Sequence, residues 1–295
     1  MASITIGMPV YNDKNFIEAS IKSILAQTFT DFNLIIADDC SSDGSADICL
    51  KYAAIDSRIT YIKHKNNIGI SQNMKFLLMQ ARTDFFMWAA DDDLWSTDYV
   101  ETLLNNLKQS KTGIVSFCTF ATIDEANNII KDQIDFDYHN ENVRKRLTGF
   151  IRNANDAFGY GIFRTDQIQN VEFPIWWWPN RKCAYNNIYP TLCYYLAKGD
   201  YIHCAGVPRF FNRIKSTNNI NHILPYKKDG IKELLAYILR KMNLVCFSFL
   251  LIYKTGKYGL AIITLPTLLY YWFLAPSLQK IKHFFKKAKG DKTSY

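Results

Sequence analysis

The sequence lacks the features that mark secreted, disulfide-bonded or zinc-binding proteins. Its seven cysteines, scattered over 295 residues, form no Cys-x-x-Cys pair and no Cys/His cluster, which argues against a disulfide framework and a zinc site. The first ten residues, MASITIGMPV, lack the basic stretch and the long apolar stretch of a signal peptide. We therefore expect a reducing, cytosolic compartment.

Acidic residues are scarce near the end of the chain. From Pro225 to Tyr295 there are thirteen Lys or Arg and three Asp or Glu, a net charge of +10. Because the whole chain carries +8, residues 1–224 carry −2. The basic excess belongs to a tail, and the question of a charged partner concerns that tail.

Two hydrophobic periods alternate over the first hundred residues. Short apolar runs predict buried strands, and apolar residues at helical spacing predict a helix after each strand, with Asp13 as the N-cap of the first helix. Alternation at these lengths predicts a parallel α/β sheet. The predicted strands are 4–10, 32–37, 59–63 and 85–90, and the predicted helices are 17–25, 46–54, 70–81 and 100–107.

Carboxylates follow two of these strands. Asp38 and Asp39 end the second strand, and Asp91, Asp92 and Asp93 follow the fourth. Ligands of parallel α/β sheets bind at the carboxyl ends of the strands, and a divalent cation carrying a phosphorylated ligand would neutralise such a cluster. The alternative is an acidic helix start, since Asp is favourable in the first turn of a helix.

Five segments together resemble the family 2 glycosyltransferases of GT-A fold, a Rossmann-like mixed sheet flanked by helices. The similarity covers roughly the first 165 residues and continues more weakly to about 220. The segments are MPVYN (8–12), SILAQTFTDFNLIIADDCSSDGS (23–45), NNIGISQN (66–73), WAADDDLW (88–95) and GYGIFRTD (159–166).

The resemblance implies a nucleotide-sugar donor, a Mn²⁺ or Mg²⁺ ion on an Asp-x-Asp type motif, and inversion at the anomeric carbon. Pro9 and Tyr11 would line the nucleotide base. Asp38 or Asp39 would accept a hydrogen bond from that base, and because uracil is commonest in the family, a UDP-sugar is the expected donor.

The resemblance places the metal ligand within the DDD cluster. Asp91 and Asp93 have the Asp-x-Asp spacing, in which one carboxylate would bind the ribose or sugar of the donor and the other the metal. Alignment on DDLW instead puts Ala90 at the first Asp and Asp92 at the second, so Asp91 and Asp92 are candidates for donor binding as well. Asp93, Asp91 and Asp92 are therefore all candidate ligands. In FFNRIKSTNN, which resembles the family's closing strand, Arg213 and Lys215 would reach the diphosphate, or else lie in a solvated basic loop.

The family's general base is an acidic residue near the start of a helix, where this chain has Asn186 and Asn187. A neutral amide cannot take a proton from the acceptor hydroxyl. Either Asp156, Asp166 or Glu172 serves instead, or catalysis is weak or absent. The second possibility gives the alternative function, a non-catalytic transferase-like domain that binds a nucleotide sugar or a partner at the membrane.

Three tryptophans, Trp176, Trp177 and Trp178, lie between two prolines in a predicted loop. Indole rings stack on sugars or settle at membrane interfaces. The loop could therefore bind the acceptor, contact a membrane or fold into the core. The segment FGYGIFRTD is expected to form a strand that lines the acceptor side, in which Gly159 and Gly161 would allow a close approach of substrate or backbone.

The tail contains eighteen uncharged residues, 258–275, interrupted by Pro266. As a helix this stretch would extend about 27 Å, just short of a hydrocarbon core of ~30 Å. The basic segment KIKHFFKKAKGDK follows. Interfacial or re-entrant attachment, a true span, and packing on the catalytic domain all fit, whereas long aliphatic runs with few Arg argue against nucleic-acid binding.

The sequence therefore predicts a catalytic domain over residues 1–224 and a helical, membrane-associating tail over 225–295. We expect a metal-dependent inverting glycosyltransferase at the cytoplasmic face of the cell membrane. Its acceptor would be a membrane-held glycan or a polyprenyl-linked precursor in polysaccharide or glycolipid assembly.

Overall fold

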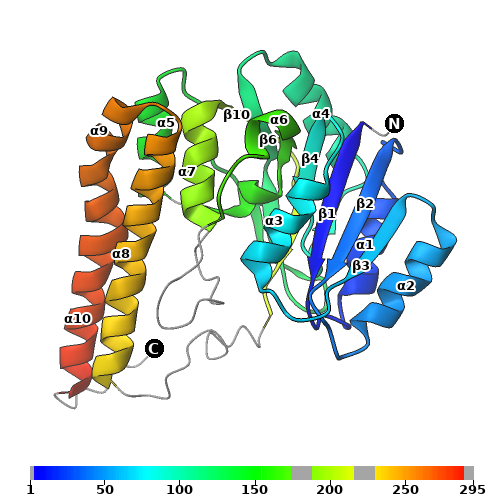
Figure 1. Cartoon of the computed structure of the whole chain (residues 1–295), viewed down its shortest axis with the longest axis horizontal. Coiled ribbons are helices and arrows are strands. Elements are labelled where there is room, and N and C mark those ends of the chain that lie inside the picture. The colour runs from blue at the N-terminus through cyan, green and yellow to red at the C-terminus, as the bar shows by residue number, and fades with distance from the viewer. Residues whose placement is uncertain (1–2, 154, 174–187, 216–229, 289–295) are drawn as a thin grey trace.

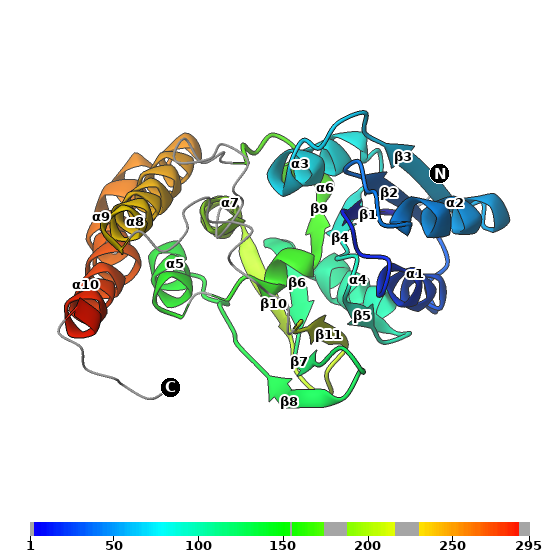
Figure 2. The ribbon, with the colours of Figure 1, turned by 90° about the horizontal axis from the view of Figure 1, so that it is seen from below.

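A computed structural model describes residues 3–153, 155–173, 188–215 and 230–288. A central sheet is flanked by helices on both faces, and a helical hairpin stands at one side (Figures 1 and 2). Trp176–Trp178, Asn186 and Asn187 lie outside the described residues.

The main sheet has seven strands, and six of them are parallel. Only the strand Ile162–Arg164 runs antiparallel, between its two neighbours. The predicted parallel α/β arrangement of the first four strands is confirmed. The strand order is β10 (Asp200–Cys204), β6 (Gly113–Cys118), β9 (Ile162–Arg164), β4 (Phe85–Trp88), β1 (Ile4–Val10), β2 (Phe32–Asp38) and β3 (Ile59–Lys63).

The helices of the first hundred residues also match their predicted positions. The predicted cap is wrong, because α1 begins at Ile17 with Phe16 at the N-cap position and no capping side chain. Asp13 instead accepts the backbone N–H groups of Phe16 and Ile17 through its carbonyl oxygen, which frees its carboxylate. The helices are α1 (Ile17–Leu25), α2 (Ser45–Ile55), α3 (Ile70–Gln80), α4 (Tyr99–Gln109), α5 (Val143–Arg152), η1 (Ala157–Tyr160), α6 (Thr165–Ile168) and α7 (Ile188–Lys198).

A second sheet brings a late part of the chain back to the acidic segment. Its order is β5 (Leu94–Trp95), β11 (Phe210–Arg213), β7 (Phe120–Ile123) and β8 (Ile129–Ile134). β11 runs antiparallel to β5, with Phe211 opposite Leu94. This pairing places the residues after β11 beside the DDD cluster.

Gly161 lets β9 enter the sheet. A Cβ atom at Gly161 would lie 2.5 Å from the carbonyl oxygen of Ser116 and 2.9 Å from Val115. The expected close approach is therefore present at Gly161, and the neighbour is backbone. At Gly159 the nearest atom to such a Cβ, on Leu192, is 3.8 Å away, so that glycine is not required by packing.

The tail forms a helical hairpin that packs on the catalytic domain. Its first arm is α8 (Gly230–Lys254), and its second is a continuous helix of α9 (Tyr258–Leu268), the π-helix η3 (Leu269–Leu274) and α10 (Ala275–Ala288). The expected break at Pro266 is wrong, because the helix continues and the π-helical turns that follow adjust the hydrogen-bond ladder.

Candidate active site

Three carboxylates meet at the carboxyl edge of the main sheet. Oxygen atoms of Asp13, Asp91 and Asp92 all lie within 4.8 Å of one another. Asp13 follows β1 and the other two follow β4, and these neighbouring strands run parallel. Asp13 is buried, and the other two are half-buried, so repulsion between them is only partly screened by water.

Backbone contacts hold this group in place. The backbone N–H of Tyr11 donates to Asp91 Oδ2 at 3.1 Å. The buried hydroxyl of Ser20, on α1, donates to the carbonyl oxygens of Asp91 and Asp93 at 3.0 and 2.8 Å. The loop after β4 is thereby fixed to the first strand and the first helix.

Lys215 supplies a positive charge to the group. Its Nζ lies 2.6 Å from Asp13 Oδ2 and 2.8 Å from Asp92 Oδ2. The side chain is 21% exposed, so it is not part of a solvated loop. The lysine ammonium bridges two carboxylates as a bound cation would.

Burial and mutual repulsion make the negative charge of this group costly. Burial, followed by the charges of Asp13 and Asp92, raises the pKa of Asp91 well above its usual range. Burial also raises the pKa of Asp13, although Lys215 opposes this. For Lys215 burial disfavours the charged form, but Asp92 and Asp13 outweigh it and the pKa is raised.

Asp93 and Arg213 do not belong to the three-carboxylate group, and their side chains form hydrogen bonds between β11 and the acidic loop. The carboxylate of Asp93 accepts the backbone N–H of Arg213 at 2.6 Å and the side-chain amide of Asn212 at 3.2 Å. The guanidinium of Arg213 donates to the carbonyl oxygens of Asp92 and Asp124 and to the side chain of Asn127. Both side chains are buried, and together they join β11 to the acidic loop.

Asp38 and Asp39 are also committed to internal hydrogen bonds. Asp38 accepts the Tyr61 hydroxyl at 2.7 Å and the backbone N–H of Ser41 at 2.8 Å. Asp39 accepts the backbone N–H groups of Ile68 and Gly69. Both lie at the expected sheet edge, but neither belongs to the three-carboxylate group.

The expected base-binding residues lie at the same edge. Pro9 is buried within β1. Tyr11, directly after β1, is 53% exposed, so its ring is available to a ligand. Sequence reasoning missed Asp13 as a site residue, although its position three residues after Val10, at the end of a buried strand, could have indicated it.

The three candidate bases have different surroundings. Asp156 immediately precedes η1 and is exposed. Burial, followed by the charges of Asp93, Asp92, Asp156 and Asp91, raises the pKa of Tyr160, so Asp156 and the acidic loop act on the same side chain. Of the other two candidates, Glu172 is ion-paired with Lys75 and Asp166 lies at the opposite edge of the sheet.

The carboxylate of Glu172, the second candidate base, is paired with the ammonium group of Lys75 at 3.1 Å. Asp166 lines a cavity of about 460 Å³ together with residues 81–85, which lead into the amino end of β4. Asp166 therefore lies at the edge opposite the acidic group.

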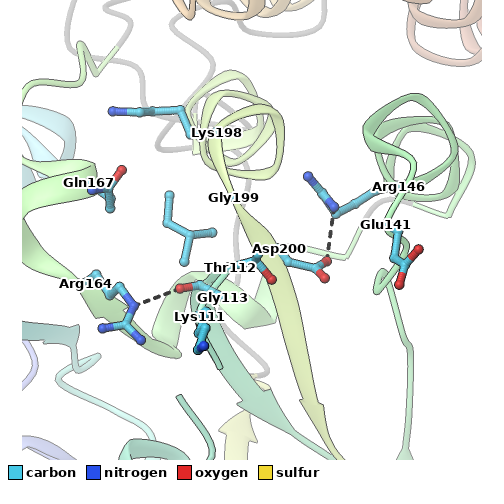
Figure 3. Close-up of a pocket in the computed structure, with 11 residues that line it drawn as sticks. Lys111, Thr112, Gly113, Glu141, Arg146, Arg164, Gln167, Lys198, Gly199 and Asp200 are labelled. Atoms are coloured by element: carbon cyan, nitrogen blue, oxygen red, sulfur yellow. Dashed lines mark hydrogen bonds and ion pairs between the residues drawn. The ribbon is translucent and has the colours of Figure 1, made fainter. Parts of the chain in front are cut away.

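A second cavity, of about 590 Å³, also lies at the amino edge (Figure 3). Its two arginines are used internally: Arg146 pairs with Asp200 at 3.1 Å, and Arg164 donates to the carbonyl oxygen of Gly113 at 2.9 Å. These residues hold the starts of β6 and β10 in place and lie apart from the acidic group.

A parallel sheet whose carboxyl edge gathers carboxylates is the arrangement of enzymes that hold a phosphorylated ligand through a cation. The chain belongs to glycosyl transferase family 2, whose family model matches residues 5–170. The suspected family and the predicted GT-A fold class are thereby confirmed.

Two curated relatives illustrate the similarity. A putative teichuronic acid biosynthesis glycosyltransferase, TuaG of Bacillus subtilis, is 33% identical over 101 residues, covering 34% of this chain and 40% of TuaG. A GalNAc(5)-diNAcBac-PP-undecaprenol beta-1,3-glucosyltransferase of Campylobacter jejuni is 23% identical over 204 residues, covering 69% of this chain and 65% of the relative. The aligned part is less than two thirds of either relative's length.

Solved structures share the fold. S. aureus TarS 1–349 in complex with UDP-GlcNAc superposes with a TM-score of 0.61 at 12% identity, covering 95% of this chain and 82% of TarS. Mannosyltransferase PcManGT from Pyrobaculum calidifontis, in complex with GDP-Man and Mn²⁺, gives a TM-score of 0.57 at 17% identity, covering 99% of this chain and 76% of PcManGT.

Proposed function

We propose that this chain is a cation-dependent glycosyltransferase that moves a sugar, with inversion, from a nucleotide-sugar donor to a membrane-held acceptor. The observation that carries the proposal is the group of Asp13, Asp91 and Asp92 at the carboxyl edge of the sheet. Family membership over residues 5–170 supports the reaction class. The UDP-GlcNAc complex of a structural neighbour supports a UDP-sugar as donor.

The residues present fit a Mn²⁺ or Mg²⁺ ion. Three carboxylate oxygens in reach of one another are hard donors of the kind both ions prefer, and an ammonium group already bridges two of them. Asp91, Asp92 and Asp13 would hold the ion, with Asp93 supporting the loop. When bound, the ion would neutralise charge that develops on the leaving diphosphate.

The chain's own side chains would perform the rest of donor binding. Tyr11 offers an exposed ring to the nucleotide base, and Pro9 shapes the strand end below it. Asp38 and Asp39 fix the loops around the base pocket through their backbone hydrogen bonds. Lys215, released from Asp92, would reach the diphosphate, whereas Arg213 holds the loop.

The acceptor hydroxyl must lose a proton, and the position of Asp156 supports it as the base. It is exposed, so an acceptor can reach it, and its charge acts on Tyr160 together with the charges of the acidic loop. A base on the side opposite the leaving diphosphate gives attack from that side and hence inversion.

A membrane-held acceptor is supported by one relative and by the tail. The Campylobacter relative is named for an undecaprenol-linked substrate. Among the described residues, one helix, Tyr258–Lys282, is long and apolar enough to cross a bilayer, and 22% of its most apolar stretch is buried. We place the protein at the cytoplasmic face of the membrane, with the basic tail against lipid.

The test incubates the full-length protein with UDP-, GDP- and dTDP-sugars and Mn²⁺, with undecaprenyl-diphosphate-linked sugars as acceptors. The expected result is slow donor hydrolysis without an acceptor, faster transfer with one, and loss of both on chelation of the cation. Donor turnover that is unaffected by chelation would overturn the proposal.

A further inference from the structure

The outer side of the tail hairpin is apolar along its whole length. On each arm, large hydrophobic side chains that are 38% exposed or more follow one another at intervals of three, four or eight residues. The stripe on the first arm consists of Leu235, Leu239, Met242, Leu250 and Tyr253, and the stripe on the second consists of Tyr258, Ile262, Tyr270, Leu274 and Leu278. No charged residue interrupts either stripe, so each arm presents a continuous apolar face to its surroundings.

The inner side of the same hairpin is fixed to the catalytic domain. Ile252, Ala261, Leu268 and Trp272 are buried in the core that includes α5 and α7. The indole N–H of Trp272 donates to the carbonyl oxygen of Ile151, at the end of α5. Lys257 donates to the carbonyl oxygen of Ala197, near the end of α7. The candidate span is therefore docked from its first turn to its middle.

This docking is incompatible with a helix that crosses the bilayer. A spanning helix is surrounded by lipid or by other spanning segments. α5 is only ten residues long and has the sequence VRKRLTGFIR, with four basic side chains, so it cannot accompany a partner through hydrocarbon. The span could form only if Trp272 and its neighbours left the core.

Basic residues flank the apolar stripes at both ends of the hairpin. Lys254 lies at the closed end, and Lys280 and Lys282 lie toward the open end. The two arms are joined there by Tyr237, whose ring lies under Lys280 at 5.8 Å and under Lys241 at 5.6 Å. In a spanning helix these basic ends would face opposite leaflets, whereas in a flat hairpin they face one layer of headgroups.

We propose that the hairpin lies flat in the interface of an anionic bilayer, with its outer stripes in the acyl region and its lysines among the headgroups. The inference rests on the proposed function only in that the membrane carries the acceptor. The open end of the hairpin lies on the same side of the molecule as the carboxyl edge of the sheet (Figure 1). A flat hairpin would thus leave the carboxyl edge of the sheet open on the side of the molecule where the hairpin's open end lies.

The first experiment sediments the full-length protein with phosphatidylcholine vesicles containing a quarter phosphatidylglycerol. The double variant I262D/L274D places two charges in the outer stripe and should bind at least tenfold more weakly. The control I55D/V207D makes the same change at two exposed residues of the catalytic domain, which are 71% and 64% exposed, and should bind as the parent does. Equal binding by both double variants would overturn the proposal.

The second experiment separates a flat hairpin from a span. Cys40, Cys183 and Cys246 are replaced by serine, and a single cysteine is introduced at Gly259, where a Cβ meets nothing within 4 Å, or at the exposed Gln279. Each protein is labelled with a nitrobenzoxadiazole dye and added to preformed vesicles. External dithionite should bleach both positions completely, and protection of either one would establish a span and overturn the flat arrangement.

Mn²⁺-dependent UDP binding is measured on every variant. It reports on the proposed function independently, because none of these substitutions lies at the acidic group. Absence of UDP binding in the parent would refute the transferase assignment while leaving the lipid results interpretable.

Discussion

At the level of single residues, the charge balance around Lys215 decides what the site can hold. Three carboxylates and one ammonium leave a net negative charge at the sheet edge. A divalent cation would neutralise more of this negative charge than the Lys215 ammonium does, because it carries two positive charges and has several coordination positions. Lys215 would then be free for the diphosphate of the donor.

Replacing Asp92 by asparagine should lower the transfer rate about a thousandfold. The change removes both a direct ligand of the ion and a partner of Lys215, and a loss of ~4 kcal/mol of transition-state stabilisation corresponds to that factor. Initial rates of UDP release measure it. The control is Asp132→Asn on the exposed strand β8, and a rate within a few fold of the parent for Asp92→Asn would contradict the assignment.

Replacing Asp91 by asparagine should stabilise the cation-free protein at neutral pH. Because the folded-state pKa of Asp91 is raised above the unfolded value, the folded state binds its proton more tightly. Stability should therefore increase as the pH falls from above the folded pKa toward the unfolded pKa of ~3.9. Thermal unfolding in EDTA between pH 8 and 5 should show this increase in the parent and a weaker one in the variant.

Replacing Asp156 by asparagine should strongly slow transfer yet preserve Mn²⁺-dependent UDP binding, because a base acts on the acceptor and not on the donor. A loss of about 100- to 1000-fold is expected for a general base. Asp166→Asn, at the opposite sheet edge, is the matched control. Full transfer activity in Asp156→Asn would exclude that residue.

The sequence predicted part of this site. Asp91 and Asp92 were found because three adjacent carboxylates follow an apolar strand. Asp13 is not predicted as a site residue because it is 78 positions from Asp91 in the sequence. A local sequence pattern does not show that two such distant residues lie close together in the fold. The hydrogen bonds that occupy Asp93 and Asp39 also depend on distant backbone, so their structural roles could not be predicted from spacing.

At the level of secondary structure, the sequence predicts the strands, including one within GYGIFRTD, but it does not predict where the strand of GYGIFRTD inserts in the sheet. β1 to β4 are apolar runs followed by helices, and their positions agree with expectation. β9 has three residues and pairs antiparallel with two distant strands. Its place depends on tertiary packing, which Gly161 permits.

Replacing Gly161 by alanine should destabilise the protein by about 1–3 kcal/mol, since the new Cβ would collide with the backbone of Ser116. Gly159→Ala, two residues away, should cost little because there is room for its Cβ. Urea unfolding followed by circular dichroism measures both. Equal destabilisation by the two substitutions would show that packing at β9 is not the cause.

At the level of the whole molecule, the catalytic domain and the tail share part of one hydrophobic core. Composition suggested a boundary at residue 224, where the charge changes sign. The structure shows that residues of the hairpin complete the core around α5 and α7, and burial of this kind cannot be deduced from charge. The tail is both a packing element and the surface we propose for lipid.

Replacing Trp272 by alanine should therefore destabilise the catalytic domain, although the residue lies in the tail. Loss of a buried indole costs about 3–5 kcal/mol, and the hydrogen bond to Ile151 is lost as well. The unfolding transition of the full-length protein should shift as a single step. A separate, earlier transition of the tail alone would contradict the shared core.

The central claim is that Asp13, Asp91 and Asp92 hold a cation together with a nucleotide diphosphate. Isothermal titration of UDP into the full-length protein, with Mn²⁺ or with EDTA, tests it most directly. The account predicts binding that requires Mn²⁺ and disappears in the Asp91→Asn/Asp92→Asn double variant. Binding of equal strength in EDTA, or in the double variant, would contradict it.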